Sequence, residues 1–284
     1  MIKAIVLDVD GVVVGPRSDQ YPHPTRRLTG ILQDIRQRGI SVSLLSGKTS
    51  FIIGETIRHI GLSGLHVADS GAVVFDAMRD MSVFENTIEP SALKQLIRAF
   101  ADTDINLHAF SRRDYVQLRP FEPAFNARYI NLIGRPPADM ALDSFIASQP
   151  TLKLNIYAFN PTQKQQIDEI LAQFCEQDFH INPWSLNPGA AGVSIRNVTA
   201  SGVSKHSGFT KLLEHRGVEA HEVLGVGDTL HDWDFIEHCG YKGVMSNATD
   251  ELKEKYNLEA PNQHMGGHVD DDGLIDIFSY FKLL

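Results

Sequence analysis

Two aspartates follow a short apolar segment near the N-terminus and could serve one metal ion and one reacting phosphorus atom. Lys3–Leu7 is a β-branched apolar run, typical of a strand that is buried on both faces of a parallel sheet, and Asp8-Val9-Asp10-Gly11 follows it directly. Ligands of open parallel sheets gather beyond the carboxyl ends of the strands. Carboxylates spaced i, i+2 at such an end suit this chemistry, although an ordinary Asp-Gly turn contains the same residues.

Two further polar segments could bind a phosphate group. Ser46-Gly47 follows a second apolar run, and a hydroxyl with exposed backbone N–H groups before a helix is a natural phosphate site. A helix cap would need the same residue types. Lys205 stands at the start of an expected helix, where its charge is unfavourable to the helix dipole. A bound phosphate would explain this lysine, and a solvated surface lysine is the alternative.

Three carboxylates lie within seven residues after another buried strand. Asp228, Asp232 and Asp234 would repel one another unless a cation lay among them. Mg²⁺ prefers oxygen ligands and keeps several waters, so that one or two carboxylates are sufficient to bind it. An acidic helix start, which the dipole favours, would explain one or two of these residues better than all three. The cluster therefore predicts a Mg²⁺ site.

One α/β core must position all of these residues, because each group follows an apolar β segment. Segments with a helical spacing of apolar residues alternate with the strands before residue 61 and again after residue 205. This alternation predicts an α/β fold with a doubly wound, Rossmann-like parallel sheet. The expected core strands, with the short helix between the last two, are Lys3–Leu7, Ile40–Leu45, Glu222–Val226, Trp233–His238 (helix) and Tyr241–Met245.

The middle of the chain has a different pattern, which predicts an α+β domain inserted into the core. Ile105–Phe110, Tyr115–Leu118 and Leu152–Phe159 are expected strands between amphipathic helices. In Leu152–Phe159, apolar residues alternate with Lys153, Asn155 and Tyr157, as in a sheet with one wet face. We therefore expect a core of residues 1–79 and 190–284 and an inserted domain of residues 80–189.

The composition is that of an acidic globular protein. The chain is 43% hydrophobic and 21% charged, with a formal net charge of −9, so a broad surface for nucleic acid is not expected. Its apolar runs are too short to cross a bilayer, and its beginning has no signal-peptide pattern. Cys175 and Cys239 are expected to be buried free thiols. These features indicate a cytoplasmic protein with neither a membrane nor a nucleic-acid partner; they leave its oligomeric state open.

The order of the motifs adds a resemblance. Asp8-x-Asp10-Gly11, Ser46-Gly47, Lys205 and Gly227-Asp228-x-x-x-Asp232 resemble the four motifs of the haloacid dehalogenase-like (HAD) hydrolase superfamily. Gly202-Val203-Ser204-Lys205, with Asn247 following the next strand, resembles the Cof-like phosphatases, in which a large α/β cap lies between the second and third motifs. The resemblance covers the whole chain; it is specific in the core and only topological in the insert.

The resemblance implies a role for each core residue. Asp8 would attack phosphorus and form an aspartyl-phosphate, and Asp10 would protonate the leaving oxygen and then activate water. Ser46 and the Gly47 N–H would hold phosphoryl oxygens, which Lys205 would neutralise. Mg²⁺ is the implied cofactor. Its implied ligands are the Asp8 carboxylate, the Asp10 backbone carbonyl and Asp228, with Asp232 completing or supporting the shell.

The chain also departs from the family pattern, and the departures concern the substrate. Large-cap members more often have Thr-Gly-Arg where this chain has Ser46-Gly47-Lys48, and Asn-Asp where it has His231-Asp232. Charged and polar residues of the insert could also grip a substrate, although a solvated basic turn is the simpler explanation for the arginines. The candidate substrate contacts are Lys48, Arg112, Arg113, Lys153, Asn155 and His231.

We therefore expect a Mg²⁺-dependent phosphatase that acts on a small phosphorylated metabolite, with sugar phosphates favoured. A phosphomutase or phosphotransferase of the same fold is the nearest alternative. A non-catalytic phospholigand-binding protein has little need for both Asp8 and Asp10. A glycosyltransferase with a DxD motif would explain neither Lys205 nor the cluster around Asp228.

Overall fold

The computed structural model describes residues 1–186, 192–257 and 259–284, and the chain divides into two compact units. Residues 1–84 with 204–284 form one unit, called the core here, and residues 85–203 form the other, called the insert. The expected boundaries lay after residues 79 and 189, and the second of these falls outside the residues that the structure describes. No described helix has the length and apolar character that a membrane span requires.

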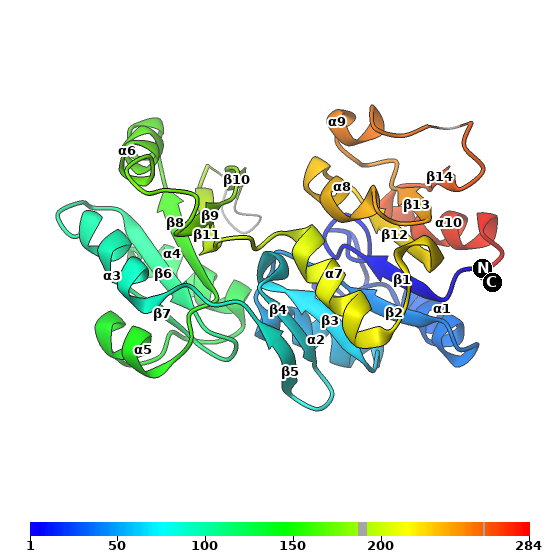
Figure 1. Cartoon of the computed structure of the whole chain (residues 1–284), viewed down its shortest axis with the longest axis horizontal. Coiled ribbons are helices and arrows are strands. Elements are labelled where there is room, and N and C mark those ends of the chain that lie inside the picture. The colour runs from blue at the N-terminus through cyan, green and yellow to red at the C-terminus, as the bar shows by residue number, and fades with distance from the viewer. Residues whose placement is uncertain (187–191, 258) are drawn as a thin grey trace. The chain divides into compact units, whose positions relative to one another are not determined.

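The core is built on a parallel sheet of five strands in the order β14-β13-β12-β1-β2 (Figure 1). Four of these strands lie within a residue of where the sequence predicts them, because buried apolar runs with defined ends specify strands well. The short edge strand β14 has no such run and was not expected. The bounds are β1 Ala4–Leu7, β2 Ser41–Leu44, β12 Val223–Gly227, β13 Tyr241–Val244 and β14 Gln263–Met265.

A three-stranded antiparallel segment extends this architecture beyond β2. A parallel bridge joins Leu45 to Val67, and the Ser46 N–H donates to the Val67 carbonyl at 3.1 Å. The strands of the segment are β3 Leu65–Ala68, β4 Val73–Asp76 and β5 Met81–Glu85, with a 3₁₀ turn (η1) at Asp69–Gly71 between the first two.

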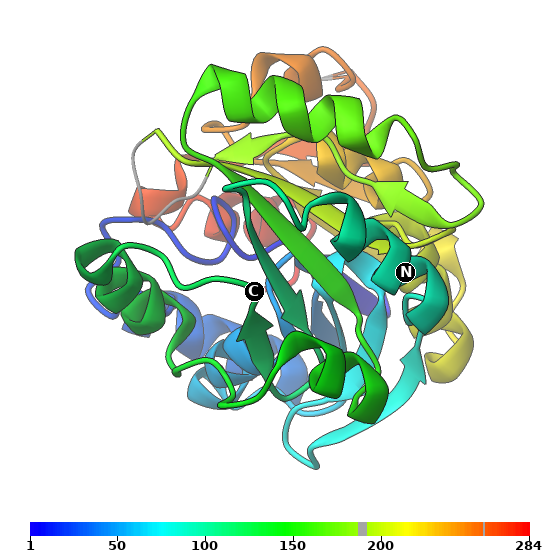
Figure 2. The ribbon, with the colours of Figure 1, turned by 90° about the vertical axis from the view of Figure 1, so that its left-hand side faces the viewer.

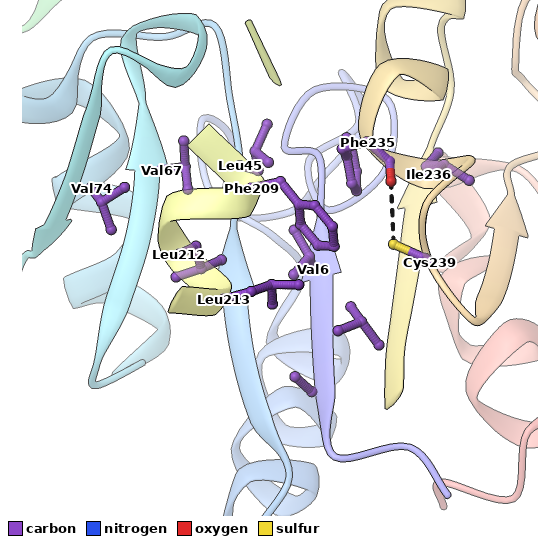
Figure 3. Packing of buried hydrophobic residues seen from close by; sticks show 12 residues of the cluster. Val6, Leu45, Val67, Val74, Phe209, Leu212, Leu213, Phe235, Ile236 and Cys239 are labelled. Carbon is purple, nitrogen blue, oxygen red and sulfur yellow. Dashed lines mark hydrogen bonds between the residues drawn. The ribbon is translucent and has the colours of Figure 1, made fainter. Parts of the chain in front are cut away.

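Helices cover both faces of the core sheet, as a doubly wound fold requires (Figure 1). Phe209 of α7 lies beside Val6 of β1 in a buried cluster that also includes Phe235 of α8 (Figure 3). Burying such a side chain stabilises the fold by roughly 1.5–3 kcal/mol. The predicted α/β class is therefore confirmed. The helices and 3₁₀ turns are α1 Arg26–Gln37, α2 Ser50–Ile60, α7 Lys205–Arg216, η2 Ala220–Glu222, α8 Leu230–Ile236, α9 Asp250–Lys253, η3 Val269–Asp271 and α10 Leu274–Tyr280.

The insert is an α+β unit with an antiparallel sheet in the order β10-β11-β8-β6-β7, and β9 pairs with β11 (Figure 2). Its strands are β6 Asn106–Phe110, β7 Tyr115–Gln117, β8 Lys153–Ala158, β9 Phe179–Ile181, β10 Ser185–Leu186 and β11 Ser194–Ala200. Its helices are α3 Pro90–Ala99, α4 Pro123–Ile133, α5 Leu142–Ser148 and α6 Pro161–Leu171.

The prediction that one face of β8 is exposed to solvent is wrong. Tyr157 is fully buried, and its ring packs edge-on against those of Tyr129 in α4 and Phe121. Alternation identifies residues that share a face of a strand, but it does not say what covers that face. The expectation for the cysteines is wrong in one case: both are free thiols, Cys239 is buried, and Cys175 is exposed.

Candidate active site

Lys205 joins two carboxylates that come from distant parts of the chain. It is the first residue of α7, and the Ser204 side chain caps this helix by accepting from the Ser207 N–H. The Lys205 Nζ donates to Asp8 Oδ1 at 2.6 Å and to Asp232 Oδ1 at 2.5 Å. Its side chain is only 14% exposed, so the alternative of a solvated surface lysine is wrong.

Asp232 is fully buried, and both of its oxygens have protein partners. While Oδ1 receives Lys205, Oδ2 accepts from the Asp228 N–H at 3.1 Å and from the Thr229 N–H and hydroxyl, each at 2.9 Å. These bonds satisfy free N–H groups at the start of α8, where the helix dipole also favours a carboxylate. Asp232 therefore fixes both Lys205 and the segment that carries Asp228.

A third carboxylate completes a compact acidic group. One oxygen from each of Asp8, Asp228 and Asp232 lies within 4.8 Å of the others. Gly11 makes this approach possible, because a Cβ atom there would lie 1.9 Å from Asp228 Oδ2. Its φ of +76° is also a conformation that favours glycine. These segments therefore lie together at the carboxyl ends of β1 and β12, as the sequence predicts.

Burial and mutual repulsion shift the charges of this group. Burial raises the pKa of Asp8 to about 7 against the attraction of Lys205, and Asp232 adds to the rise. Burial also raises the pKa of Asp228 to about 8, with Asp8 and Asp232 contributing.

The other two members keep their charged forms. The pKa of Asp232 lies below its ordinary value although burial opposes this, because Lys205 and the N–H donors favour the ionised carboxylate. Burial alone would lower the pKa of Lys205, but Asp232 and Asp8 outweigh it and hold the pKa above its ordinary value. When all three carboxylates are ionised, one ammonium faces three negative charges, and a divalent cation would cancel the remaining two.

The donor set fits Mg²⁺, which binds oxygen ligands and keeps several waters. Because the oxygens of Asp232 are taken by Lys205 and by the start of α8, Asp8 and Asp228 are the carboxylates best suited to bind the ion. The side chain of Asp10 lies outside the group, and its Oδ1 accepts from Lys48 Nζ at 2.7 Å. The Asp10 carbonyl remains a predicted ligand.

Ser46 and Gly47 lie directly beyond β2, close to the segment around Ser70. The Ser46 hydroxyl accepts from the Lys48 N–H at 3.1 Å, and the Ser46 backbone N–H donates to the Val67 carbonyl. Thr49, not Ser46, holds the capping position of α2, so the alternative of a helix cap is wrong for Ser46. A Cβ atom at Gly47 would lie at an ordinary contact distance of 3.4 Å from Ser70 Oγ. This contact therefore does not require a glycine, and a role of Gly47 in phosphate binding stays a prediction.

The remaining candidates are dispersed. His231 is exposed on the first turn of α8. The other four belong to the insert. Arg112 Nε lies 3.7 Å from Glu85 Oε1, and Lys153 Nζ lies 5.4 Å from the centroid of the Phe110 ring. The Arg113 N–H bonds to Ser111 Oγ at 3.4 Å, and Asn155 Nδ2 donates to the Tyr157 hydroxyl at 3.2 Å. A substrate role for each stays a prediction.

Two residues beside the site make contacts that the sequence did not predict. Asp234 Oδ2 accepts from the His206 N–H at 2.7 Å and so ties the starts of α7 and α8 together. Asn247, in the turn after β13, donates to the Gly11 carbonyl at 2.9 Å. The sequence placed Asp234 in the acidic cluster, but the compact group that the described residues form contains Asp8, Asp228 and Asp232 and not Asp234. For Asn247, the available signal was its position just beyond the carboxyl end of a core strand.

Comparisons with known proteins agree with this arrangement. Residues 5–275 match the model of the haloacid dehalogenase-like hydrolases. A phosphoglycolate phosphatase from Methanothermobacter thermautotrophicus is 38% identical over 266 residues, which are 94% of this chain and 95% of that protein.

Solved structures show the same fold. A haloacid dehalogenase-like hydrolase from Bacteroides thetaiotaomicron matches with a TM-score of 0.81 and 17% identity, covering 100% of both chains. A sugar phosphatase of HAD subclass IIB matches with a TM-score of 0.77 and 16% identity, covering 99% of this chain and 100% of that chain. This protein therefore belongs to the haloacid dehalogenase-like hydrolase family, as the motifs predict, and is an enzyme of the hydrolase class.

Proposed function

We propose that this protein is a Mg²⁺-dependent phosphatase that hydrolyses a small phosphorylated metabolite through an aspartyl-phosphate on Asp8. The observation that carries the proposal is the Lys205 ammonium, held between Asp8 and Asp232 beside Asp228. An anionic nucleophile can approach an anionic phosphate only where cations offset their repulsion. The names of the relatives, a phosphoglycolate phosphatase and a sugar phosphatase, support a phosphate monoester as the substrate.

The reaction divides into two steps. An Asp8 oxygen attacks phosphorus, the bond to the ester oxygen breaks, and the leaving oxygen takes a proton from Asp10. Water then attacks the aspartyl-phosphate while Asp10 accepts a proton from it, which releases inorganic phosphate and restores the Asp8 carboxylate. Ser46 and the Gly47 N–H would orient the phosphoryl oxygens, and Lys205 would neutralise them. When bound at Asp8 and Asp228, Mg²⁺ would supply Lewis-acid stabilisation of the phosphoryl charge.

The test is phosphate release from a panel of phosphorylated metabolites that includes phosphoglycolate and several sugar phosphates. Asp8→Asn should remain folded and lose all but a trace of turnover, because an amide does not form the acyl-phosphate. Asp34→Asn, at an exposed position of α1, is the matched control and should behave as the wild type. Turnover by Asp8→Asn near the wild-type rate would refute the assignment of the nucleophile.

The metal has its own test. Activity should require Mg²⁺ and be blocked by Ca²⁺ at comparable occupancy, because Ca²⁺ takes more ligands at longer distances. Full activity after exhaustive chelation would contradict the metal requirement. Analysis of phosphorylated products in the same assays would reveal transfer to a second hydroxyl, the outcome expected of a phosphomutase or phosphotransferase.

We assign substrate specificity to the insert, and Asn155 is its best candidate among the polar residues predicted from sequence. Its Oδ1 is buried and has no hydrogen-bond partner among the residues that the structure describes, while its amide donates to Tyr157. A carbonyl oxygen in this state can accept a hydrogen bond from a substrate hydroxyl. Sugar phosphates, which carry several hydroxyls, stay the favoured substrate class.

Asn155→Ala should raise KM for the true substrate by roughly 5- to 150-fold, the equivalent of one hydrogen bond to a buried acceptor. Turnover of p-nitrophenyl phosphate should not change, because a small generic ester lacks that hydroxyl. Gln165→Ala, at an exposed position of α6, is the control. Equal KM values for Asn155→Ala and the control would remove Asn155 from the specificity site, and Arg112, Arg113 and Lys153 would be tested next.

A further inference from the structure

Asn247 bridges two main-chain groups from opposite ends of the chain. It lies in the turn after β13, its Nδ2 donates to the Gly11 carbonyl at 2.9 Å, and its Oδ1 accepts from the Val269 N–H at 2.9 Å. A backbone carbonyl can only accept and a backbone N–H can only donate, so both bonds fix the orientation of the amide. A side chain at this position must therefore carry both a donor and an acceptor.

The partner on the N-terminal side is a residue on which the site depends. Gly11 follows Asp10 directly, and its Cα lies against the Asp228 carboxylate so closely that no side chain fits between them. A shift of Gly11 would therefore move Asp10 and would also change the surface against which Asp228 packs.

The same turn also holds the segment of Asp228 through main-chain bonds. The Met245 N–H donates to the Gly227 carbonyl at 3.3 Å, and the Thr249 N–H donates to the Asp228 carbonyl at 2.8 Å. Residues 245–249 are thus bonded to both acid-bearing segments, and the Asn247 side chain supplies the bond to the segment of Asp10.

We propose that Asn247 is a positioning residue, which fixes Gly11, and hence Asp10, relative to Asp228. The proposal rests on the proposed phosphatase reaction, in which Asp10 transfers a proton in both steps. Asn247 does not touch the reacting atoms. Its effect should appear in kcat, because a misplacement of about 1 Å can lower the rate of a reaction roughly 100-fold.

Two variants distinguish the effect of losing the hydrogen-bond donor of Asn247 from the effect of losing its whole side chain. Asn247→Asp keeps the shape and the acceptor for Val269 but sets a carboxylate oxygen against the Gly11 carbonyl. Asn247→Ala removes both bonds. The matched control is Asn262→Asp, because Asn262 Nδ2 donates to the carbonyl of Gly240, another glycine, at 2.8 Å, before β13 instead of after it.

The experiment measures kcat, KM, the unfolding temperature and the hydrogen exchange of residues 9–15. We expect both Asn247 variants to lose about 10- to 100-fold in kcat with KM changed less than about threefold. They should also exchange amides 9–15 faster than Asn262→Asp does at an equal unfolding temperature. Either variant is sufficient for the test if the other does not fold.

Two outcomes would overturn the inference. One is a kcat of the Asn247 variants within about twofold of the wild-type value. The other is an equal loss in all three variants, which would show a general effect of removing an Asn–Gly bond. Failure of the proposed function gives a different result, because Asp8→Asn would then keep its turnover whatever the Asn247 variants do.

Discussion

Replacing Lys205 by methionine should strongly destabilise the metal-free protein. The change removes the ammonium from between Asp8 and Asp232 but keeps most of the apolar side chain. The Lys205 side chain is 14% exposed, and its two partners are 9% and 0% exposed. Removing one partner of a buried pair leaves an uncompensated charge and costs about 3–5 kcal/mol. We expect a loss of this size in the free energy of unfolding, measured by urea titration in chelator at neutral pH.

A double-mutant cycle identifies the cause of the loss. Asp232→Asn removes the buried charge and can still accept from Thr229, so the double variant should lose less than the sum of the single changes, by about 0.5–3 kcal/mol. Additivity within about 0.5 kcal/mol would refute the buried Lys205–Asp232 pair. Lys211 and Glu214, an exposed pair 2.7 Å apart on the same helix, provide the matched cycle. Its coupling should be about 0.3–0.5 kcal/mol, as for other exposed helix pairs.

Three further predictions concern pH, backbone conformation and the insert. Without metal, the free energy of unfolding should fall as the pH rises from about 5 to 8. Burial raises the pKa of Asp8 to about 7 and that of Asp228 to about 8, whereas both groups ionise near pH 4 in the unfolded chain. In this pH range the folded state therefore binds more protons than the unfolded chain, so it loses stability as the protons leave. Urea titrations at several pH values would check this, and Mg²⁺ should flatten the profile. Gly11→Ala should abolish turnover and cost at least about 1–2 kcal/mol in unfolding experiments, because of its positive φ and the clash with Asp228. Tyr129→Phe removes the hydroxyl that lies 3.0 Å from His108 Nδ1 and 2.6 Å from the Tyr157 hydroxyl, and it should cost about 1–3 kcal/mol by urea titration. A loss below about 0.5 kcal/mol would contradict a stabilising role for these two bonds.

Much of the core could be predicted because its signals are local. A buried parallel strand is a continuous apolar run, and the polar residues that end such runs meet at one edge of the sheet. This rule is sufficient to bring Asp8, Asp228 and Asp232 together, since their segments lie on the neighbouring strands β1 and β12. Their acidic character then indicates a cation site without any knowledge of the loops.

Contacts made by the loops could not be predicted in the same way. The ion pair between Lys48 and Asp10 and the bond from Asn247 to Gly11 join segments that are 38 and 236 residues apart. Their formation depends on turn conformations that no periodicity encodes. In the insert, the alternation in β8 correctly groups Lys153, Asn155 and Tyr157, but the aromatic cover over Tyr157 is a tertiary contact.

The distribution of the two lysines explains where a metal ion would stabilise the site most. Lys205 is shared by Asp8 and Asp232, and Lys48 pairs with Asp10. Among the described residues, Asp228 has no basic side chain within ion-pair distance, and it packs against Gly11. Burial raises the pKa of both Asp228 and Asp8, but only Asp8 has the Lys205 ammonium at 2.6 Å. A divalent cation would therefore supply Asp228 with the positive charge that Lys205 supplies to Asp8. The Asp228 carbonyl is bonded to the turn of Asn247, so we expect the positioning of that segment and the affinity for the ion to be linked.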